Sequence, residues 1–226
     1  MSADTQRLLT ALQFADSAFP SGGFAFSWGL EGLQADGLVT TFDDVAEIVA
    51  EQLRQRWATM DRILLARAHA ASGNDELARI DVTAEVACTS EQLRTGSRRA
   101  GRALIGMAAR LGYPGALSYR AVVTADERLG HLPVVQGLVF REAGLDGPTA
   151  EALGAWSLLN GLTSAALRLG LIGHVQAQQL AITLRPAVAA LLDRETDRDG
   201  PLSSFTPLID IAVSRRGRRD LNLFAT

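Results

Sequence analysis

The sequence predicts an all-α protein, a single-domain bundle of about eight to ten helices. Apolar residues recur at helical spacing along nearly the whole chain, as in Val45, Ile48, Val49 and Leu53. The breaks between these periodic segments carry residues that start or stop helices. Convincing alternation of polar and apolar residues, which is typical of a strand, is missing; the one candidate, YRAVVTAD at residues 119–126, is short. These three observations favour helices throughout.

Each predicted helix begins or ends at residues suited to that place. TTFDD makes Thr41 the N-cap of a long helix with two aspartates in its first turn, and ASGND around Gly73 ends that helix. LDGP offers Asp146 or Gly147 as the cap of a helix whose first turn holds Pro148. The helices are predicted over residues 5–16, 26–36, 42–72, 75–87, 90–112, 132–144, 148–170, 174–194 and 203–213.

Composition indicates one soluble globular domain over residues 1–226. The chain is 47% hydrophobic with a net charge of -3, so it has no global attraction to nucleic acid. All 22 basic residues are Arg, which excludes lysine chemistry such as a P-loop or a Schiff base. Cys88 is the single cysteine, which excludes an internal disulfide and suits a reducing compartment, so we expect the cytoplasm. No secretion signal and no membrane segment is expected.

The C-terminal region carries a charged connector and a tail. Residues 193–201 read DRETDRDGP, and residues 214–226 then form a basic segment with Leu221, Leu223 and Phe224 near its tip. Such a tail is typical of an arm that docks on a partner. A frayed terminus explains the same residues equally well.

Tests for catalytic chemistry find no complete set of residues. AFSWG resembles a G-x-S-x-G nucleophile elbow with Ser27 as nucleophile, but that elbow needs a strand and a sheet. His69, His131 and His174 are isolated, with no Cys or second His at ligand spacing, so no metal site is predicted. SGGF lacks the lysine of a phosphate-binding loop, and no cofactor is expected. An interaction protein is therefore the leading class.

Two kinds of surface residue fit that class. The clusters RTGSRRAGR and SRRGRR indicate a solvated helix face or a protein-facing salt-bridge surface, because the overall balance is acidic. Phe19, Phe24, Phe26 and Trp28 lie in and beside a glycine turn, where large apolar side chains often anchor an interface. The competing interpretation, that they cover the core, remains equally good for each of them.

Five segments, in order, resemble the UreF family of urease accessory proteins. They are LLTALQFADSAFPSGGFAFSWGLEG, SRRAGRALIGMAARLG, HLPVVQGLVFREAGL, AWSLLNGLTSAALRLGLIGH, and SSFTPLIDIA followed by a terminal LF. The first holds the most specific pattern, D-S-x-x-P-x-G-G-F-x-x-S-x-G-L-E. The tail departs from the family's usual H-E-x-x-Y-x-R-L-F, because Arg216 and Gly217 replace the His-Glu pair, Asp220 replaces the Tyr, and Asn222 replaces the Arg.

The resemblance implies an all-α, non-enzymatic scaffold that forms a homodimer, joins the accessory protein UreD or UreH, and recruits the GTPase UreG. The complex then delivers nickel to the urease apoenzyme, and the scaffold holds no well-defined metal site of its own. A small serine hydrolase using Ser27 and a helical regulator of an unrelated GTPase are the alternatives. Trp156 and Asn160 fall in the family's dimer interface. The implied partner-binding residues are Phe19, Pro20, Gly22, Gly23, Phe24, Ser27, Glu31, Arg216, Leu221, Asn222, Leu223 and Phe224.

Overall fold

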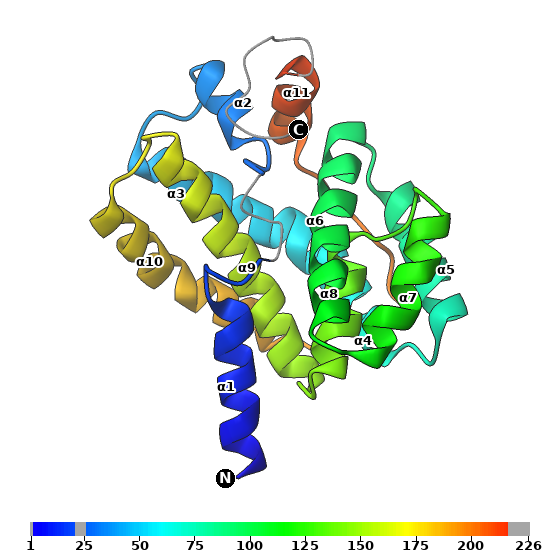
Figure 1. Cartoon of the computed structure of the whole chain (residues 1–226). Helices are drawn as coiled ribbons and strands as arrows, with labels where there is room; N and C mark the ends of the chain where they lie inside the picture. Colours follow the sequence, from blue (N-terminus) through cyan, green and yellow to red (C-terminus); the bar gives the residue numbers. More distant parts are fainter. Residues whose placement is uncertain (1, 21–25, 217–226) are drawn as a thin grey trace.

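The computed structural model describes residues 2–20 and 26–216, and the regular secondary structure of these residues is entirely helical (Figure 1). If the continuous helix 42–70 is counted once, they form ten helices, which confirms the predicted all-α bundle. The elements are α1 (Ala3–Ala15), α2 (Leu30–Ala35), α3 (Phe42–Gln52), the π-helix η2 (Leu53–Asp61), α4 (Arg62–Ala70), α5 (Asn74–Ala87), α6 (Glu91–Arg110), α7 (Pro114–Ala125), α8 (Leu132–Glu142), α9 (Gly147–Arg168), α10 (His174–Leu192) and α11 (Pro207–Arg216).

Helix α8 lies at the centre of the bundle, between α4, α6, α7 and α9. Every residue from Pro133 to Phe140 is buried, so this helix has no solvent face along that length. Its backbone approaches α4 closely at Gly137. A Cβ added there would collide with the carbonyl oxygen of Leu65 and lie 2.8 Å from the Cβ of Ala68. The contact between these helices therefore requires glycine.

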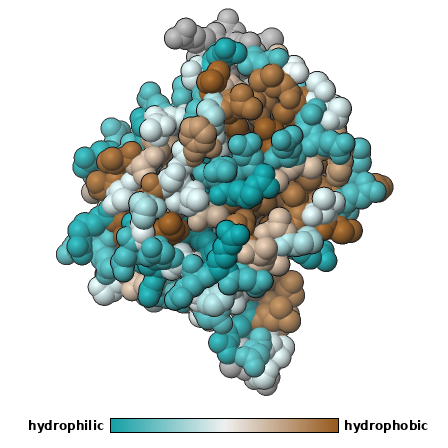
Figure 2. Space-filling view, turned by 180° about the vertical axis from the view of Figure 1, so that it is seen from behind, coloured by the Kyte–Doolittle hydropathy of each residue, from teal (hydrophilic) through white to brown (hydrophobic). Residues whose placement is uncertain are grey.

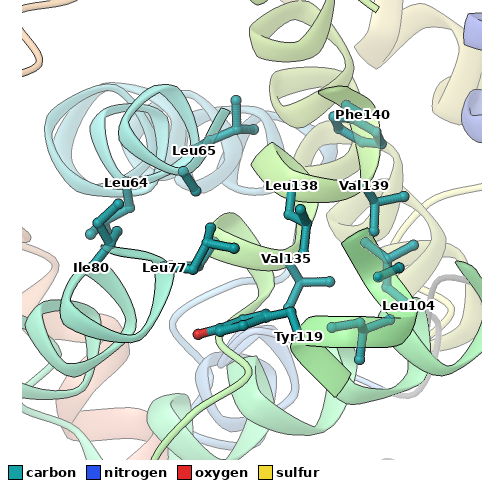
Figure 3. Close-up of a cluster of buried hydrophobic side chains, with 14 of the residues drawn as sticks. Leu64, Leu65, Leu77, Ile80, Leu104, Tyr119, Val135, Leu138, Val139 and Phe140 are labelled. Atoms are coloured by element: carbon teal, nitrogen blue, oxygen red, sulfur yellow. The ribbon is translucent and has the colours of Figure 1, made fainter. Parts of the chain in front are cut away.

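Two clusters of buried side chains form the core. The first surrounds α8, and Figure 3 shows its side chains converging from α4, α5, α6, α7 and α8. The second joins α2, α3, η2, α9, α10 and α11, and includes Leu30, Leu33, Val45, Trp57, Leu159, Leu162 and Leu180. Burial of this apolar surface is the main stabilising term of the fold.

The predicted helix over 42–72 is present but contains a π-helical segment, η2, that the sequence pattern did not indicate. Its start agrees with prediction, because Thr41 and Asp44 form a capping box. Its end falls at Ala70, and Gly73 is instead the residue before α5. A π-helix is rare, and its wider turn shifts the faces that later residues present.

The predicted helices omit α7, which holds residues 119–125 of the short strand candidate. Pro114 occupies the first turn of α7. A proline is tolerated there because the backbone N–H groups of the first turn have no partner within the helix. Ala116, Tyr119 and Val123 are the buried residues, at intervals of three and four, which is helical spacing.

Helix α1 projects from the body of the molecule (Figure 1), and Figure 2 shows hydrophobic surface on this projection. Leu8, Leu9 and Leu12 are each more than half exposed there. In the described part of the chain, none of the helices combines the length and the apolar character that crossing a membrane requires.

A buried carboxyl group connects α5 to the loop before α8. The side chain of Asp81 is fully buried and accepts hydrogen bonds from the Tyr119 hydroxyl (2.7 Å), the Gly130 amide (2.6 Å) and the His131 amide (2.8 Å). Tyr119 lies at one edge of the first cluster (Figure 3). Burial raises the pKa of Asp81 to about 6, although all three donors act to lower it.

We expect Asp81 to make folding depend on pH. Because its folded pKa lies above the unfolded value of about 4, the native state holds a proton that the unfolded state has released. The contribution of Asp81 to stability therefore falls as pH rises from about 4 to about 6, by about 3 kcal/mol. Asp81→Asn should remove this decline, as measured by urea unfolding across that range. Tyr119→Phe keeps the carboxyl group but loses a donor, so it should retain the decline. If the unfolding free energies of the wild type and of Asp81→Asn changed in parallel with pH, Asp81 would not be the titrating group.

Candidate docking site

The segment just before α2 makes a tight turn that places α2 against the C-terminal helix. Trp28 has a φ of 50° and is the one non-glycine residue in residues 2–20 and 26–216 with a positive φ. Gly29, the N-cap of α2, follows with a φ of 88°. A left-handed tryptophan is unfavourable in isolation, so the packing around it must hold it in place.

Helix α11 lies against α2 at two glycines. A Cβ added at Gly29 would lie 2.7 Å from a methyl of Ile209, and one at Gly32 would lie 2.8 Å from the carbonyl oxygen of Ala212. Ile209 and Ala212 are both buried. The glycines of the SWGLEG segment therefore form a seat in which α11 lies, and we call this contact the glycine seat.

Electrostatic contacts hold α2 in the same place. Arg215 of α11 forms an ion pair with Asp36 at 3.5 Å, at the end of α2. Gln34 donates a hydrogen bond of 3.0 Å to the carbonyl of Leu169, which follows α9. Glu31 is buried, and although burial lowers the pKa of Arg168 on α9, the Glu31 carboxylate acts to raise it. Helix α2 is thus anchored to both α9 and α11.

Three of the four aromatic residues beside the predicted glycine turn lie in the described part of the chain, and they pack onto the bundle. Phe26 is 5% exposed, and its ring would lie 3.1 Å from a Cβ added at Gly96 of α6. Its ring centroid is 6.0 Å from that of the half-buried Trp28. Phe19 is half-buried, with its ring centroid 4.8 Å from that of Phe14, in the first cluster. These contacts match the interpretation that such residues cover the core.

A small cavity of about 50 Å³ lies beneath Trp28, enough for a few water molecules. Residues of η2, α6, α8 and α9 line it, among them Arg56 and Asp61 of the π-helix. The Arg56 guanidinium lies 5.9 Å from the centroid of the Trp28 ring, and its Nε is 3.3 Å from Asp61 Oδ2. This buried ion pair supports Trp28 from below.

Burial acts on both members of this pair. It raises the pKa of Asp61, while the neighbouring Arg56 acts in the opposite direction. Burial also acts to lower the pKa of Arg56, but the Asp61 carboxylate, Cys88 and Asp210 together outweigh it and the pKa rises. Arg56 therefore remains charged, and the pair is a supporting element under the turn.

The sequence-predicted residues fall into separate parts of the molecule. Ser27 and Glu31 lie at the glycine seat, whereas Phe19 and the exposed Pro20 lie near the end of α1. Trp156 and Asn160 are one turn apart on α9, and Trp156 is 37% exposed. Arg216 ends α11, and its side chain is outside the described part. Also outside the described residues are Gly22, Gly23, Phe24, Leu221, Asn222, Leu223 and Phe224.

Ser27 lacks the surroundings of a hydrolase nucleophile. It is buried at a turn, and residues 2–20 and 26–216 contain no strand to precede it. His69 contacts the carbonyl of Leu145 at 2.9 Å, and His131 contacts Glu85 at 2.8 Å. Across the same described residues, no three His, Cys, Asp or Glu side chains gather as a group that could hold a metal ion.

Sequence reasoning missed two parts of the site. The glycine seat has a signal, because Gly29 and Gly32 are three residues apart and would lie on one face of a helix. The partner positions on α11 are separated from them by most of the chain, so no local pattern pairs them. Arg56 and Asp61 have no signal, because a charged residue in a helical pattern is ordinarily assigned to the solvent face.

Comparison with known proteins shows one consistent family. The model of the UreF family matches residues 39–185. A urease accessory protein UreF of Trichodesmium erythraeum is 28% identical over 230 residues, covering 100% of this chain and 99% of that protein. One from a Mycobacterium species is 31% identical over 220 residues, covering 97% and 99%. UreF 1 of Brucella melitensis is 29% identical over 223 residues, covering 96% and 92%.

We expect Gly32→Ala to displace α11. The new methyl group would press on the backbone carbonyl of Ala212, which cannot rotate away as a side chain could. The variant should lose about 1 to 3 kcal/mol of unfolding free energy, and the amides of residues 209–215 should exchange faster with solvent. Gly106→Ala is the matched control, because nothing lies within 4 Å of its added Cβ. Unchanged protection of α11 in Gly32→Ala would contradict the glycine seat.

Proposed function

The chain belongs to the UreF family of urease accessory proteins, and from that membership we propose that it is a non-enzymatic scaffold of urease maturation. In this proposal it works as a cytoplasmic homodimer. It binds a UreD/UreH-type accessory protein and recruits and modulates the GTPase UreG. The assembled complex inserts nickel into the urease apoenzyme, so the metal is the cargo of the assembly.

The observation that best supports a scaffold role is the glycine seat. It holds α11 beside the SWGLEG segment. The predicted docking tail, residues 214–226, starts in the last turn of α11, which ends at Arg216. The described end of the most specific motif, SWGLEG, and helix α11 therefore pack together as one unit. A partner that contacts both would recognise a single folded unit.

The outer face of α11 and the segment before it carry exposed apolar side chains. Phe205 is 67% exposed, Leu208 is 52% exposed and Ile211 is 48% exposed. The neighbouring face of α11, with Ile209 and Ala212, is buried in the glycine seat. Apolar residues gathered on the solvent side of a helix beside a proposed tail fit a protein-binding surface.

The proposed dimer interface rests on α9. Trp156 is a large aromatic residue with more than a third of its surface exposed, and Asn160 is one turn further along the same helix. Aromatic residues are enriched at the centres of interfaces, where they bury much area with little loss of conformational freedom. The two residues are placed so that a second copy could cover them together.

Co-expression with the cognate UreD/UreH-type protein and UreG tests the scaffold role. The wild-type chain should co-elute with both in size-exclusion chromatography with mass detection. Phe24→Asp and deletion of residues 221–226 should each abolish assembly, because both remove apolar docking residues. Leu117→Asp is the control, since Leu117 is an exposed apolar residue on α7, away from α11. Full assembly by both test variants would refute the assigned docking roles, and no assembly by the wild type would refute the scaffold.

Light scattering of the isolated chain tests the dimer. The wild type should have about twice the 24.1 kDa of one chain. Trp156→Asp should shift the protein to the monomer, because a carboxylate would be buried without a partner at the interface. Val175→Asp on α10, where Val175 is 73% exposed, should leave the dimer intact. A dimer that survives Trp156→Asp would place the interface elsewhere.

A further inference from the structure

A second surface, distant in sequence from the tail, carries a concentration of arginines. The segment RTGSRRAGR, which the sequence analysis singled out, lies on α6. With residues of α5 and of the loop after α7, it lines an open hollow of about 420 Å³. Helices α5 and α7 lie on the same side of α6 in Figure 1. We call this feature the arginine hollow.

Three of the arginines that line the hollow are held by neighbouring groups. Arg98 is paired with Glu85 of α5 and donates to the hydroxyl of Thr95 at 3.3 Å. Arg102 donates hydrogen bonds of 3.3 Å to the backbone carbonyls of Asp126 and Leu129. Arg128 forms an ion pair of 2.7 Å with Asp126. These guanidinium groups are therefore pre-oriented, which lowers the entropy lost when they bind an oxyanion.

The charge of the hollow is positive although the whole chain is negative. Four arginines line it against two carboxylates, Glu85 and Glu127. Glu85 is already shared among Arg94, Arg98 and His131, and its pKa is lowered because Arg98 and His131 together outweigh the effect of burial. Arg102 donates its hydrogen bonds to backbone carbonyls, and the carboxylates of Asp81 and Asp126 also interact with its charge. Positive charge at Arg99 and Arg102 therefore remains available to an anionic partner.

Apolar surface adjoins the arginine hollow. Val82 and Val86 are 40% and 77% exposed, and they are one turn apart on α5, on either side of Glu85 in the sequence. Arginines next to exposed aliphatic side chains are typical of protein interfaces. Among the described residues, no aromatic side chain lines the hollow, whereas single-stranded nucleic acids are commonly bound by stacking on such residues. The surface thus has the chemistry of a protein-docking site.

We propose that the arginine hollow docks an acidic segment of a partner protein, with its carboxylates on Arg99 and Arg102 and an apolar residue against Val82 and Val86. The partner is a component of the complex proposed above, so the inference rests on that function and adds a second contact surface to it. Paired carboxylates match the planar, two-pronged donors of arginine.

The hollow is tested first without any partner. A fluorescein-labelled hexaglutamate peptide is titrated with the full chain at low salt, and its anisotropy is followed. Arg99→Glu should weaken binding about tenfold, and the difference should shrink as salt is raised. Arg185→Glu, at an exposed arginine of α10, is the charge-matched control and should bind within about twofold of wild type. Arg99 is exposed and has no ion pair within the described residues, so the substitution should leave the fold intact.

The second arm measures the cognate UreD/UreH-type protein and UreG separately on immobilised chain. One of them should bind Arg99→Glu about tenfold more weakly than wild type, mainly through slower association. Equal binding of both partners to wild type and Arg99→Glu would overturn the proposal. Equal binding of hexaglutamate to the two would also overturn it, as would a hollow that binds inorganic phosphate but not the peptide. The two arms can also disagree. If Arg99→Glu weakens hexaglutamate binding but the wild type binds neither protein, the scaffold function is refuted, while the binding of acidic peptides by the hollow is supported.

Discussion

The close approach of α8 to α4 at Gly137 is the contact on which the rest of the bundle depends. Because α8 is buried along its length, its position sets where α4, α6, α7 and α9 can lie. A methyl group at Gly137 would meet the backbone of α4, so the two axes could not keep their separation. Without strands to set the spacing between elements, these helices owe their arrangement to such backbone contacts and to the interlocking of side chains.

The same device recurs at the surface with a functional consequence. Gly29 and Gly32 allow the close approach of α11 as Gly137 allows that of α4, but here the contact joins α2 to a helix from the other end of the sequence. Residues 27–32 thereby pack against the C-terminal helix, whose neighbouring face carries the exposed Leu208 and Ile211. A scaffold whose proposed tail continues from a fixed helix loses less entropy when it binds than one whose tail begins in a loop.

Buried charges are the other organising feature, and each has a partner. Arg62 joins η2 and α4 to the ends of α9 and α10 through Glu151 (2.6 Å) and the carbonyl of Leu191 (2.6 Å). Asp81 joins α5 to α7 and to the loop before α8, and Arg56 supports Trp28. Each of these bonds connects elements far apart in the sequence, which makes the packing specific rather than merely compact. The arginine hollow differs, because part of its charge faces solvent and is free to meet another protein.

The sequence by itself determined the helical class, most helix boundaries and the family. Caps such as Thr41 and Asp146, and apolar spacing such as that of α6, are local signals, because a helix bonds residues four apart. Helix α7 was not predicted, and its residues 119–126 were noted only as a short strand candidate, although Ala116, Tyr119 and Val123 have helical spacing. Only the tertiary structure decided the π-helical turn, the burial of Arg56 with Asp61, and the seating of α11 on α2. These depend on contacts between residues far apart in the chain, and hydrophobic periodicity records which face of a helix is buried without recording what covers it.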